Sequence, residues 1–383
     1  MSCEGKQPYS AICEGGDGDK QGKQNTPNKK PVRVWMDGSF DMLHIGHITA
    51  MHKARALGDC LIVGAQSDAD VQLHKGPPVH PEEERFRLLQ ALKCVDQFVG
   101  AASYGTSVQT LDKHGCDFCV HGDDATLRAS DTDPVFHLMK INRARLVPRE
   151  LRTSTTDQIE RILKKTGTSN ADCGVVGGPS KDYVKNMQSG DLRGALLTAS
   201  IVHAIFDGRV LEPRGKVVYV DGAFDLFNVG HLSFLEKAAQ EGSYLLVGVH
   251  DDAIVSNRKG YVFPVLTMLD RAVMVLSLKC VSDVVFGAPA ILTQDFLDHF
   301  KIDLVCRGKN SVGENENGAD RYCVPKKRGI FKLIDSGNQI TSQTIVSRIV
   351  QRRAEYVARN QVKNEKEEDA AKKLKDKSPA PQV

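Results

Sequence analysis

One short segment occurs twice in this chain of 383 residues, and this repetition limits the fold more than any other feature. Residues 37–47 read Asp-Gly-Ser-Phe-Asp-Met-Leu-His-Ile-Gly-His, and residues 221–231 read Asp-Gly-Ala-Phe-Asp-Leu-Phe-Asn-Val-Gly-His. The copies are 231 − 47 = 184 residues apart. Lys75 recurs at the same offset, and after two residues inserted in the second copy, Arg85 and Gly122 recur at offset 186. A register that persists this far predicts two domains of one kind.

Short apolar runs alternate with helical patterns in both halves of the chain. This alternation predicts an α/β fold with parallel sheets covered by helices on both faces. We expect strands at 32–36, 60–64, 95–99 and 118–120, and again at 217–220, 244–249, 284–286 and 304–306. We expect helices at 46–57, from 82 onward, at 230–241 and at 270–278.

The pattern also predicts the domain boundaries. A first domain is expected at 32–164 and a second at 214–357, joined by a linker at 165–213 that carries a helix at 192–206. The two ends, 1–31 and 358–383, are polar or strongly charged and are expected to be disordered tails.

Composition excludes several classes of protein. Lys and Arg are interleaved with Asp and Glu and the net charge is 51 − 48 = +3, so nucleic acid is not expected as a partner. No apolar run reaches the roughly 18 residues of a membrane-spanning helix, and residues 1–31 lack the apolar core of a secretory signal. The ten cysteines are therefore expected to be reduced thiols in a cytoplasmic protein. Cys116 and Cys119 have the spacing of half a zinc or redox motif, but no second pair follows, and we interpret them as core residues.

The His-x-Gly-His element at 44–47 suits a nucleoside triphosphate. It follows the first predicted strand and opens a helix, whose N-terminal amides and partial positive charge favour phosphate oxygens. His44 and His47 are three residues apart, so both rings can lie on the same side of one helical turn. Gly46 lets the backbone approach a ligand without a Cβ in the way. The alternative is that the two histidines are ordinary surface or core residues. The repeat and the preceding strand favour the binding role over this alternative.

Further basic residues follow the second strand. Lys75 is expected on a loop, and its counterpart Lys259 favours a role facing phosphate over that of an ordinary solvated lysine. Arg85 and Lys93 lie eight residues apart on one predicted helix, roughly on one face. Ligand contact and an ordinary polar helix face are equally open for this pair.

Two polar segments lie at expected element ends. His121-Gly122-Asp123-Asp124 follows a strand at the edge where open parallel sheets bind ligands; a carboxylate there suits an ammonium group or a metal, and a helix cap is the alternative. Residues 154–157, Ser-Thr-Thr-Asp, resemble a capping box. The same hydroxyls leave the helix amides available to phosphate, with Arg149 or Arg152 adding charge, and the two interpretations are compatible.

These motifs resemble those of the cytidylyltransferases, α/β nucleotidyltransferases with a His-x-Gly-His loop, an Arg-Tyr-Val-Asp-like segment and an Arg-Thr-x-Gly-x-Ser-Thr-Thr signature. The matching segments here are 44–47, 93–96 and 154–156. Two tandem copies are similar to the ethanolamine-phosphate cytidylyltransferase family, whereas choline-phosphate relatives have one catalytic domain and an amphipathic membrane helix that this tail lacks. The resemblance covers about residues 32–357. It implies two tandem Rossmann-like nucleotidyltransferase domains with parallel sheets.

The resemblance implies a reaction of CTP with phosphoethanolamine that gives CDP-ethanolamine and pyrophosphate, with Mg²⁺ accompanying CTP, in phosphatidylethanolamine biosynthesis. An acceptor phosphate oxygen attacks the α-phosphorus in line, so catalysis rests on positioning and electrostatic stabilisation. The residues with implied catalytic roles are His44, His47, Lys75 and Arg149. Those implied to bind the nucleotide are Gly38, Ser39, Phe40, Gly46, Lys93, Gly122, Asp123, Ser154, Thr155 and Thr156. Asp124 and Arg85 are implied to bind the acceptor, and no protein ligands for a metal are implied.

The signature departs from the family pattern in the first copy. A gapless alignment places Arg149 on the signature arginine, with Glu150 and Arg152 in place of Thr and Gly. The alternative alignment starts at Arg152 and deletes three residues. In either alignment, the sequence of the loop that would close on CTP differs from the family signature.

The second copy departs further. Asn228 replaces the first motif histidine, Lys309-Asn310 replaces the paired aspartates, and Asp335 aligns with Arg149. Ile340-Thr341-Ser342 aligns with Ser-Thr-Thr. Residues expected to bind a nucleotide in this copy are Ala223, Phe224, Asn228, Gly230, His231, Lys259, Arg307, Gly308, Lys309 and Thr341. We hypothesise that the first domain is catalytic and the second regulatory or structural, with catalysis that depends on both as the alternative.

Two other functions stay open from the sequence. One is a catalytically impaired CTP-binding paralogue that regulates an active relative. The other is the same chemistry on phosphocholine or glycerol phosphate, although aromatic residues at 6% favour a primary amine over a quaternary one, which needs an aromatic cage. We expect the two copies to pair through a pseudo-two-fold interface, and a homodimer is also open.

Overall fold

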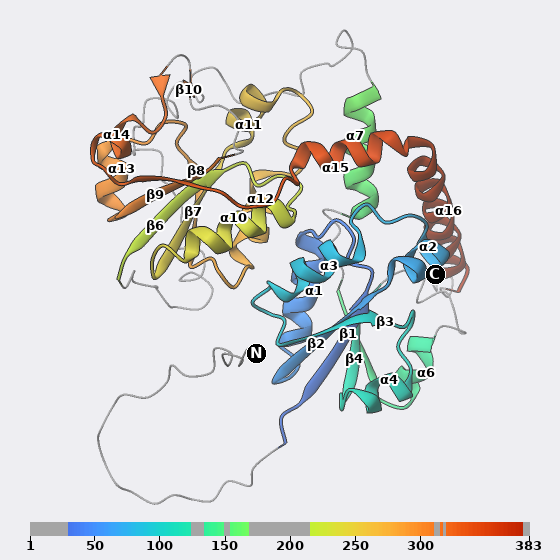
Figure 1. Cartoon of the computed structure of the whole chain (residues 1–383). Helices are drawn as coiled ribbons and strands as arrows, with labels where there is room; N and C mark the ends of the chain where they lie inside the picture. Colours follow the sequence, from blue (N-terminus) through green and yellow to red (C-terminus); the bar gives the residue numbers. More distant parts are fainter. Residues whose placement is uncertain are drawn as a thin grey trace, which may run out of the picture. The chain divides into compact units, whose positions relative to one another are not determined.

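This computed structural model describes residues 30–123, 134–148, 154–167, 215–309, 315–316 and 319–377. Two five-stranded parallel sheets, one for each repeat, form the framework (Figure 1). The prediction of two tandem Rossmann-like α/β domains is confirmed.

The two sheets have the same topology. The first consists of β1 (Arg33–Gly38), β2 (Cys60–Gln66), β3 (Gln97–Ala102), β4 (Phe118–Gly122) and β5 (Ala144–Val147), in the order β3-β2-β1-β4-β5. The second consists of β6 (Val217–Gly222), β7 (Tyr244–His250), β8 (Asp283–Ala288), β9 (Leu304–Gly308) and β12 (Phe331–Ile334), in the order β12-β9-β6-β7-β8. A short antiparallel pair, β10 (Asn315–Glu316) and β11 (Ala319–Asp320), accompanies it. All eight predicted strands are present, and each extends further at its carboxyl end; in β1 and β6 an Asp-Gly pair there remains in the ladder.

Helices connect the strands and cover the sheets (Figure 1). Those of the first repeat are α1 (Ile45–Arg55), α2 (Asp68–Lys75), α3 (Glu82–Gln90), α4 (Val108–Lys113), α6 (Pro134–Lys140) and α7 (Thr155–Gly167). Those of the second are α10 (Val229–Ala239), α11 (Asp252–Lys259), α12 (Met268–Leu276), α13 (Gln294–His299), α14 (Cys323–Lys327) and α15 (Ser342–Gln351), followed by α16 (Arg353–Lys377). The predicted helices are confirmed with small shifts of their ends.

Two local details differ from the prediction. Lys75 is the last residue of α2 rather than part of a loop, and Gly76 ends that helix with a φ of +85°. α3 ends at Gln90, so Lys93 lies beyond it and not on its face.

The central strands are mostly apolar because helices cover both faces of each sheet. In β7, for example, every residue is buried. Cys116 and Cys119 are buried in the core of the first domain, as predicted. Within the described ranges no helix is long and apolar enough to cross a membrane.

The two repeats meet through mirrored contacts, as expected for a pseudo-two-fold pair. The Lys93 amide donates to the Ser277 carbonyl, and the Lys279 amide donates to the Ala91 carbonyl, both at 2.8 Å. An antiparallel bridge pairs Leu92 with its counterpart in the second repeat. The ends of α3 and α12 therefore form a symmetric junction.

Residues 358–377 are helical, not disordered as predicted, whereas 378–383 lie outside the described residues. α16 runs to Lys377, and Tyr356 and Asn360 on it are 1% and 5% exposed. The segment is rich in Ala, Glu, Lys and Arg, which are good helix formers, and one face of it packs against α7 of the first domain. The helix predicted at 192–206, most of the linker and the tail at 1–29 lie outside the described residues.

Candidate active site

The site predicted from the repeat lies where the strand order of the first sheet reverses, between β1 and β4. In open parallel sheets, ligands bind in the crevice outside the carboxyl ends of the strands at this switch point. The loop 39–44 leaves β1 there and leads directly into α1, whose N-cap is His44. The topology therefore places the His-x-Gly-His element at the expected edge.

The loop adopts an uncommon backbone conformation. Phe40 and Met42 have φ values of 46° and 49°, in the left-handed region that non-glycine residues seldom adopt. Such strain costs of the order of 1 kcal/mol or more a residue and persists only when neighbours enforce it. Here the loop carbonyls are held from other elements: Thr155 Oγ1 donates to the Asp41 carbonyl at 2.8 Å, and Gln158 Nε2 donates to the Met42 carbonyl at 3.1 Å. The N-terminus of α7 is thereby tied to the loop that opens α1.

The two motif histidines are brought together. Their rings stack at a centroid distance of 3.9 Å, and the edge of Phe40 packs on His47 at 5.4 Å. The Gly46 amide donates to Nδ1 of His44 at 3.1 Å, so that nitrogen is an acceptor and the ring's proton belongs on Nε2. His44 can therefore offer Nε2–H to a phosphate while its other nitrogen caps the helix.

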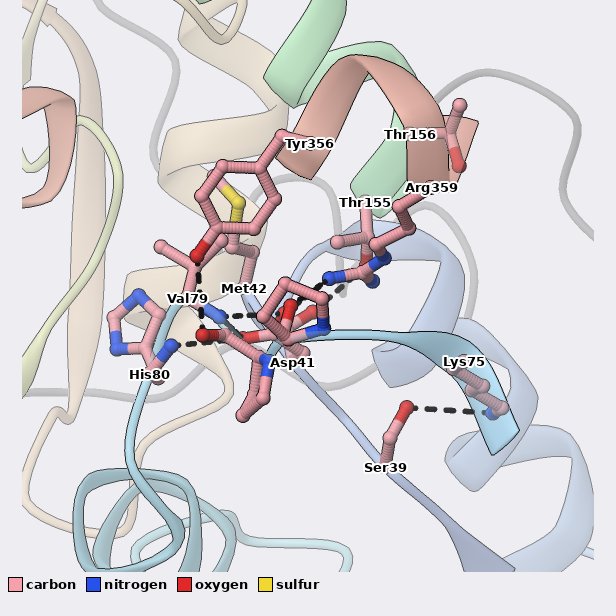
Figure 2. A network of polar contacts seen from close by, with 12 residues as sticks. Ser39, Asp41, Met42, Lys75, Val79, His80, Thr155, Thr156, Tyr356 and Arg359 are labelled. Carbon is pink, nitrogen blue, oxygen red and sulfur yellow. Dashed lines mark hydrogen bonds and ion pairs between the residues drawn. The ribbon is translucent and has the colours of Figure 1, made fainter. Parts of the chain in front are cut away.

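Lys75 lies beside the same loop. Its ammonium donates to the Ser39 hydroxyl at 3.3 Å (Figure 2). The ammonium also lies over the ring of Tyr104, 5.9 Å from its centroid. The side chain is exposed, so it can move toward an anion. Lys75 and Ser39, both predicted site residues, are thus neighbours.

A buried carboxylate organises the loop that follows Lys75. Asp41 is 1% exposed, and its carboxylate accepts hydrogen bonds from the amides of Val79 and His80 at 3.0 to 3.1 Å (Figure 2). The Arg359 guanidinium of α16 lies 3.4 Å from the same carboxylate. Sequence analysis missed Asp41 as a functional residue, although its recurrence as Asp225 was available as a signal.

The carboxyl end of β4 forms the other side of the switch point. Gly122 ends the strand, and the Asp123 amide donates to the Val147 carbonyl at 2.9 Å. His121 Nε2 lies 3.4 Å from the carboxylate of Asp37 at the end of β1. Burial alone would raise the pKa of Asp37, but the hydrogen bond and the charge of His121 outweigh it and lower that pKa. The predicted residues Asp124 and Arg149 lie outside the described residues.

The capping box predicted at the start of α7 is confirmed. Ser154 Oγ accepts from the Asp157 amide at 3.1 Å, and the Asp157 carboxylate accepts from the Ser154 amide at 2.8 Å. Thr156 is buried, and its hydroxyl accepts from Lys363 Nζ at 2.9 Å. Since the hydroxyls of Thr155 and Thr156 are bonded to protein and the Asp157 amide donates to Ser154, α7 would offer an anion the backbone amides of Thr155 and Thr156.

Arg85 is a structural residue, contrary to the prediction that it binds the acceptor. It is 1% exposed, and its guanidinium donates to the carbonyls of His80, Ser39 and Gln66 and to the Asp68 carboxylate.

Its counterpart Arg271 makes the same set of bonds, to Leu266, Ala223, His250 and Asp252. A buried arginine that makes one pattern in both repeats is part of the fold rather than a ligand-specific group.

Lys93 likewise makes its contacts away from the loop 39–44 of the first repeat. Its ammonium donates to the Leu276 carbonyl at 2.8 Å, and the ammonium of Lys279 donates to the Gln90 carbonyl at 2.8 Å. The segment that aligns with Arg-Tyr-Val-Asp therefore joins the two repeats, and its predicted nucleotide contact has no support in this geometry.

The motif of the second repeat is closed by the chain itself. Asn228 is fully buried, and its Oδ1 accepts from the amides of Gly230 and His231 at 3.0 and 3.3 Å. A Cβ at Gly230 would collide with the carbonyl oxygen of Ile340, so the missing side chain makes room for protein. Contrary to the prediction, neither Asn228 nor Gly230 presents a group to a nucleotide in this structure.

Three further predicted residues of the second repeat are buried or paired with another side chain in this structure. Burial, together with the charge of Lys259, lowers the pKa of His231 to about 3, which makes that imidazole neutral at neutral pH. Lys309 Nζ lies 3.4 Å from the carboxylate of Asp335. Arg307 is buried near the ring of Tyr322, at 5.9 Å.

The structure also corrects the alignment at the end of the second repeat. Thr341 is the N-cap of α15 and forms a capping box with Thr344, so it corresponds to Ser154 at offset 187. Ser342 Oγ donates to the Asp225 carbonyl at 2.6 Å, just as Thr155 donates to that of Asp41. Both hydroxyls of the pattern are therefore retained one position later than the sequence alignment has them.

Comparison with known proteins agrees with this geometry. A family model described as cytidylyltransferase-like matches residues 35–161 and 219–337. An ethanolamine-phosphate cytidylyltransferase of Mus musculus is 39% identical, covering 90% of this chain and 92% of that protein. Enzymes of the same name from Dictyostelium discoideum and Arabidopsis thaliana are 38% and 34% identical, covering 89% and 88% of this chain and 97% and 85% of their own. The similarity thus extends over both repeats.

Proposed function

Because the chain belongs to the ethanolamine-phosphate cytidylyltransferase family, we propose that it transfers CMP from CTP to phosphoethanolamine, which yields CDP-ethanolamine for phosphatidylethanolamine synthesis. The observation that carries the proposal is the stacked pair His44 and His47 at the N-terminus of α1, on the switch-point edge of the first sheet. Lys75 and the start of α7 border the same loop.

The geometry supports transfer without a nucleophilic side chain. A phosphate oxygen of phosphoethanolamine forms a bond to the α-phosphorus of CTP, the bond to the bridging oxygen breaks, and pyrophosphate leaves with the electron pair. His44 Nε2–H, His47 and the Lys75 ammonium would donate to the triphosphate and stabilise charge on the leaving group. The N-termini of α1 and α7 would add the partial positive charges of two helix dipoles.

Mg²⁺ belongs to this proposal as part of the substrate, entering with CTP. Magnesium usually keeps several waters and is held through substrate phosphates with one or two carboxylates. The imidazoles, ammonium and helix-terminal amides around the loop suit phosphate oxygens rather than a metal. Within the described ranges, no three His, Cys, Asp or Glu residues form a metal-binding group. We expect turnover to require added Mg²⁺, measured by titration after chelation.

The proposal assigns chemistry to the first domain and a structural or regulatory role to the second. The first has His44 as the helix N-cap, with an Nε2 donor, whereas the second has Asn228 there, without an imidazole, and the Ile340 carbonyl packed on Gly230. Asp124 as the ammonium partner, Arg149 as a catalytic cation, a cytoplasmic location and a homodimer remain predictions.

Pyrophosphate release is the direct test. Purified protein with Mg-CTP should release pyrophosphate with phosphoethanolamine and much less with phosphocholine or glycerol phosphate at equal concentration. Pyrophosphate released best with either of the other acceptors would overturn the assigned acceptor. Binding of CTP without pyrophosphate release would instead support the impaired, regulatory paralogue.

A further inference from the structure

The C-terminal helix reaches the site of the first domain through one face. Tyr356 and Asn360 are four residues apart, as are Arg359 and Lys363, which places the two pairs on adjoining parts of one side of α16. Tyr356 and Asn360 are buried, and the Arg359 side chain is 10% exposed. Tyr356 packs in a buried apolar cluster with Val79 and Ile159, and the face also forms directed hydrogen bonds to backbone carbonyls.

Each contact falls on one of two segments that shape the site. On the loop after Lys75, Tyr356 Oη donates to the Pro78 carbonyl at 3.1 Å and Arg359 donates to the Pro77 carbonyl at 2.6 Å (Figure 2). On the first turn of α7, Lys363 Nζ donates to the Thr156 hydroxyl at 2.9 Å.

Arg359 joins these segments at their common anchor, the carboxylate of Asp41 (Figure 2). That carboxylate holds the amides of Val79 and His80, and the Asp41 carbonyl receives the Thr155 hydroxyl. A buried carboxylate needs a compensating charge and satisfied hydrogen bonds. Arg359 lies within ion-pair distance and also fixes the loop through the Pro77 carbonyl.

We propose that Arg359 is a positioning residue for CTP binding, acting from the C-terminal helix on the Lys75 loop and the Asp41 anchor. The proposal rests on the proposed function, because the site it shapes is the triphosphate site of the first domain. Arg359 does not touch substrate; it holds Lys75 and the start of α7 in register with His44. Misplacement of binding groups by about 1 Å can cost up to two orders of magnitude in rate.

The experiment compares Arg359→Ala, Arg359→Lys and Arg353→Ala in the full chain. Arg353 is the matched control, since it donates from the same helix to the Leu163 carbonyl of α7 but contacts no part of the Lys75 loop or the Asp41 anchor in the bonds described. Each protein is assayed for the KM for CTP and for kcat, titrated with Mg-CTP by calorimetry, and melted to compare thermal midpoints.

We expect Arg359→Ala to raise the KM and Kd for CTP about tenfold or more, with a smaller change in kcat. Arg359→Lys should restore part of the lost CTP affinity. In Arg353→Ala, the KM and Kd for CTP should stay within about twofold of the wild-type values. Equal effects of Arg359→Ala and Arg353→Ala on CTP affinity would overturn the proposal, because helix docking alone would then explain them. CTP affinity unchanged in Arg359→Ala would overturn it as well. Should Arg359→Ala fail to fold, Lys363→Met tests the same face, and CTP affinity within twofold of the wild type would contradict it.

Calorimetry separates this inference from the proposed function. If wild-type protein binds CTP but releases no pyrophosphate with phosphoethanolamine, the proposed function fails while the titration still tests Arg359. If wild-type protein binds no CTP, both fail.

Discussion

Replacing Arg348 by methionine should weaken the attachment of α15 to the first domain. The Arg348 guanidinium donates to both carboxylate oxygens of Glu84, at 2.7 and 2.8 Å, and His80 lies 3.0 Å from the same carboxylate. Burial alone would raise the pKa of Glu84, but the hydrogen bonds from Arg348 and His80 outweigh it and hold that pKa at about 2.

The magnitude follows from that pKa. The ordinary pKa of a glutamate is 4.5, so lowering the pKa of Glu84 to about 2 corresponds to about 3 kcal/mol of stabilisation. Arg348 shares this stabilisation with His80, and its side chain is 26% exposed. We therefore expect Arg348→Met to lower the free energy of unfolding by about 2 kcal/mol at pH 7.

The pH dependence has a definite sign. A carboxyl whose pKa is depressed in the folded state stabilises above its unfolded pKa and loses that contribution as pH falls through its folded pKa. The difference between wild type and Arg348→Met should thus be full above about pH 5 and shrink steadily toward pH 2.

Denaturant unfolding at several pH values, followed by circular dichroism, measures the effect. The control is Arg352→Met, whose partner Glu355 is an exposed neighbour on the same segment; this change should cost under 1 kcal/mol. The reasoning would be refuted if both variants lost the same free energy of unfolding. It would also be refuted if the loss in Arg348→Met did not decrease as the pH is lowered.

Three further groups of substitutions test other parts of the structure. Arg85→Ala and Arg271→Ala should each destabilise by about 3 kcal/mol or more, because each strands buried acceptors; a soluble, stable Arg85→Ala protein with only a raised KM for the acceptor would restore the original prediction for that residue. Lys93→Met and Lys279→Met should destabilise by similar amounts, about 1 kcal/mol each, since their contacts are mirrored, and a loss of CTP affinity confined to Lys93→Met would contradict this. Gly230→Ala should lower the thermal midpoint through its collision with a neighbouring carbonyl, and an unchanged midpoint would show that the second motif is open.

The framework of the protein was predictable because it depends on local patterns. Continuous apolar runs gave all eight predicted strands, and the capping box at Ser154 and Asp157 followed from residue types at fixed spacing. The placement of His44 and His47 followed as well, since a motif between a strand and a helix has one position in a parallel sheet.

Residues whose role depends on distant partners were not predictable. Arginine is a residue type usually found on the surface, and only the fold shows that four hydrogen-bond acceptors surround Arg85. α16 has no apolar stripe; its docking uses the single buried ring of Tyr356 and carbonyls of a loop nearly 300 positions earlier, such as that of Pro77. Lys93 aligned with a family segment, but alignment carries no information on whether that segment faces a ligand or the other repeat.

Separate assays of His47→Ala and His231→Ala test the central claim most directly, namely that the first domain alone carries the histidines used in transfer. Pyrophosphate release with Mg-CTP and phosphoethanolamine should fall by about two orders of magnitude or more in His47→Ala. It should stay within a few fold of the wild type in His231→Ala, whose imidazole packs against Phe224 and Phe227 beside a motif closed by its own chain. Loss of turnover in His231→Ala with His47→Ala still active would contradict the account.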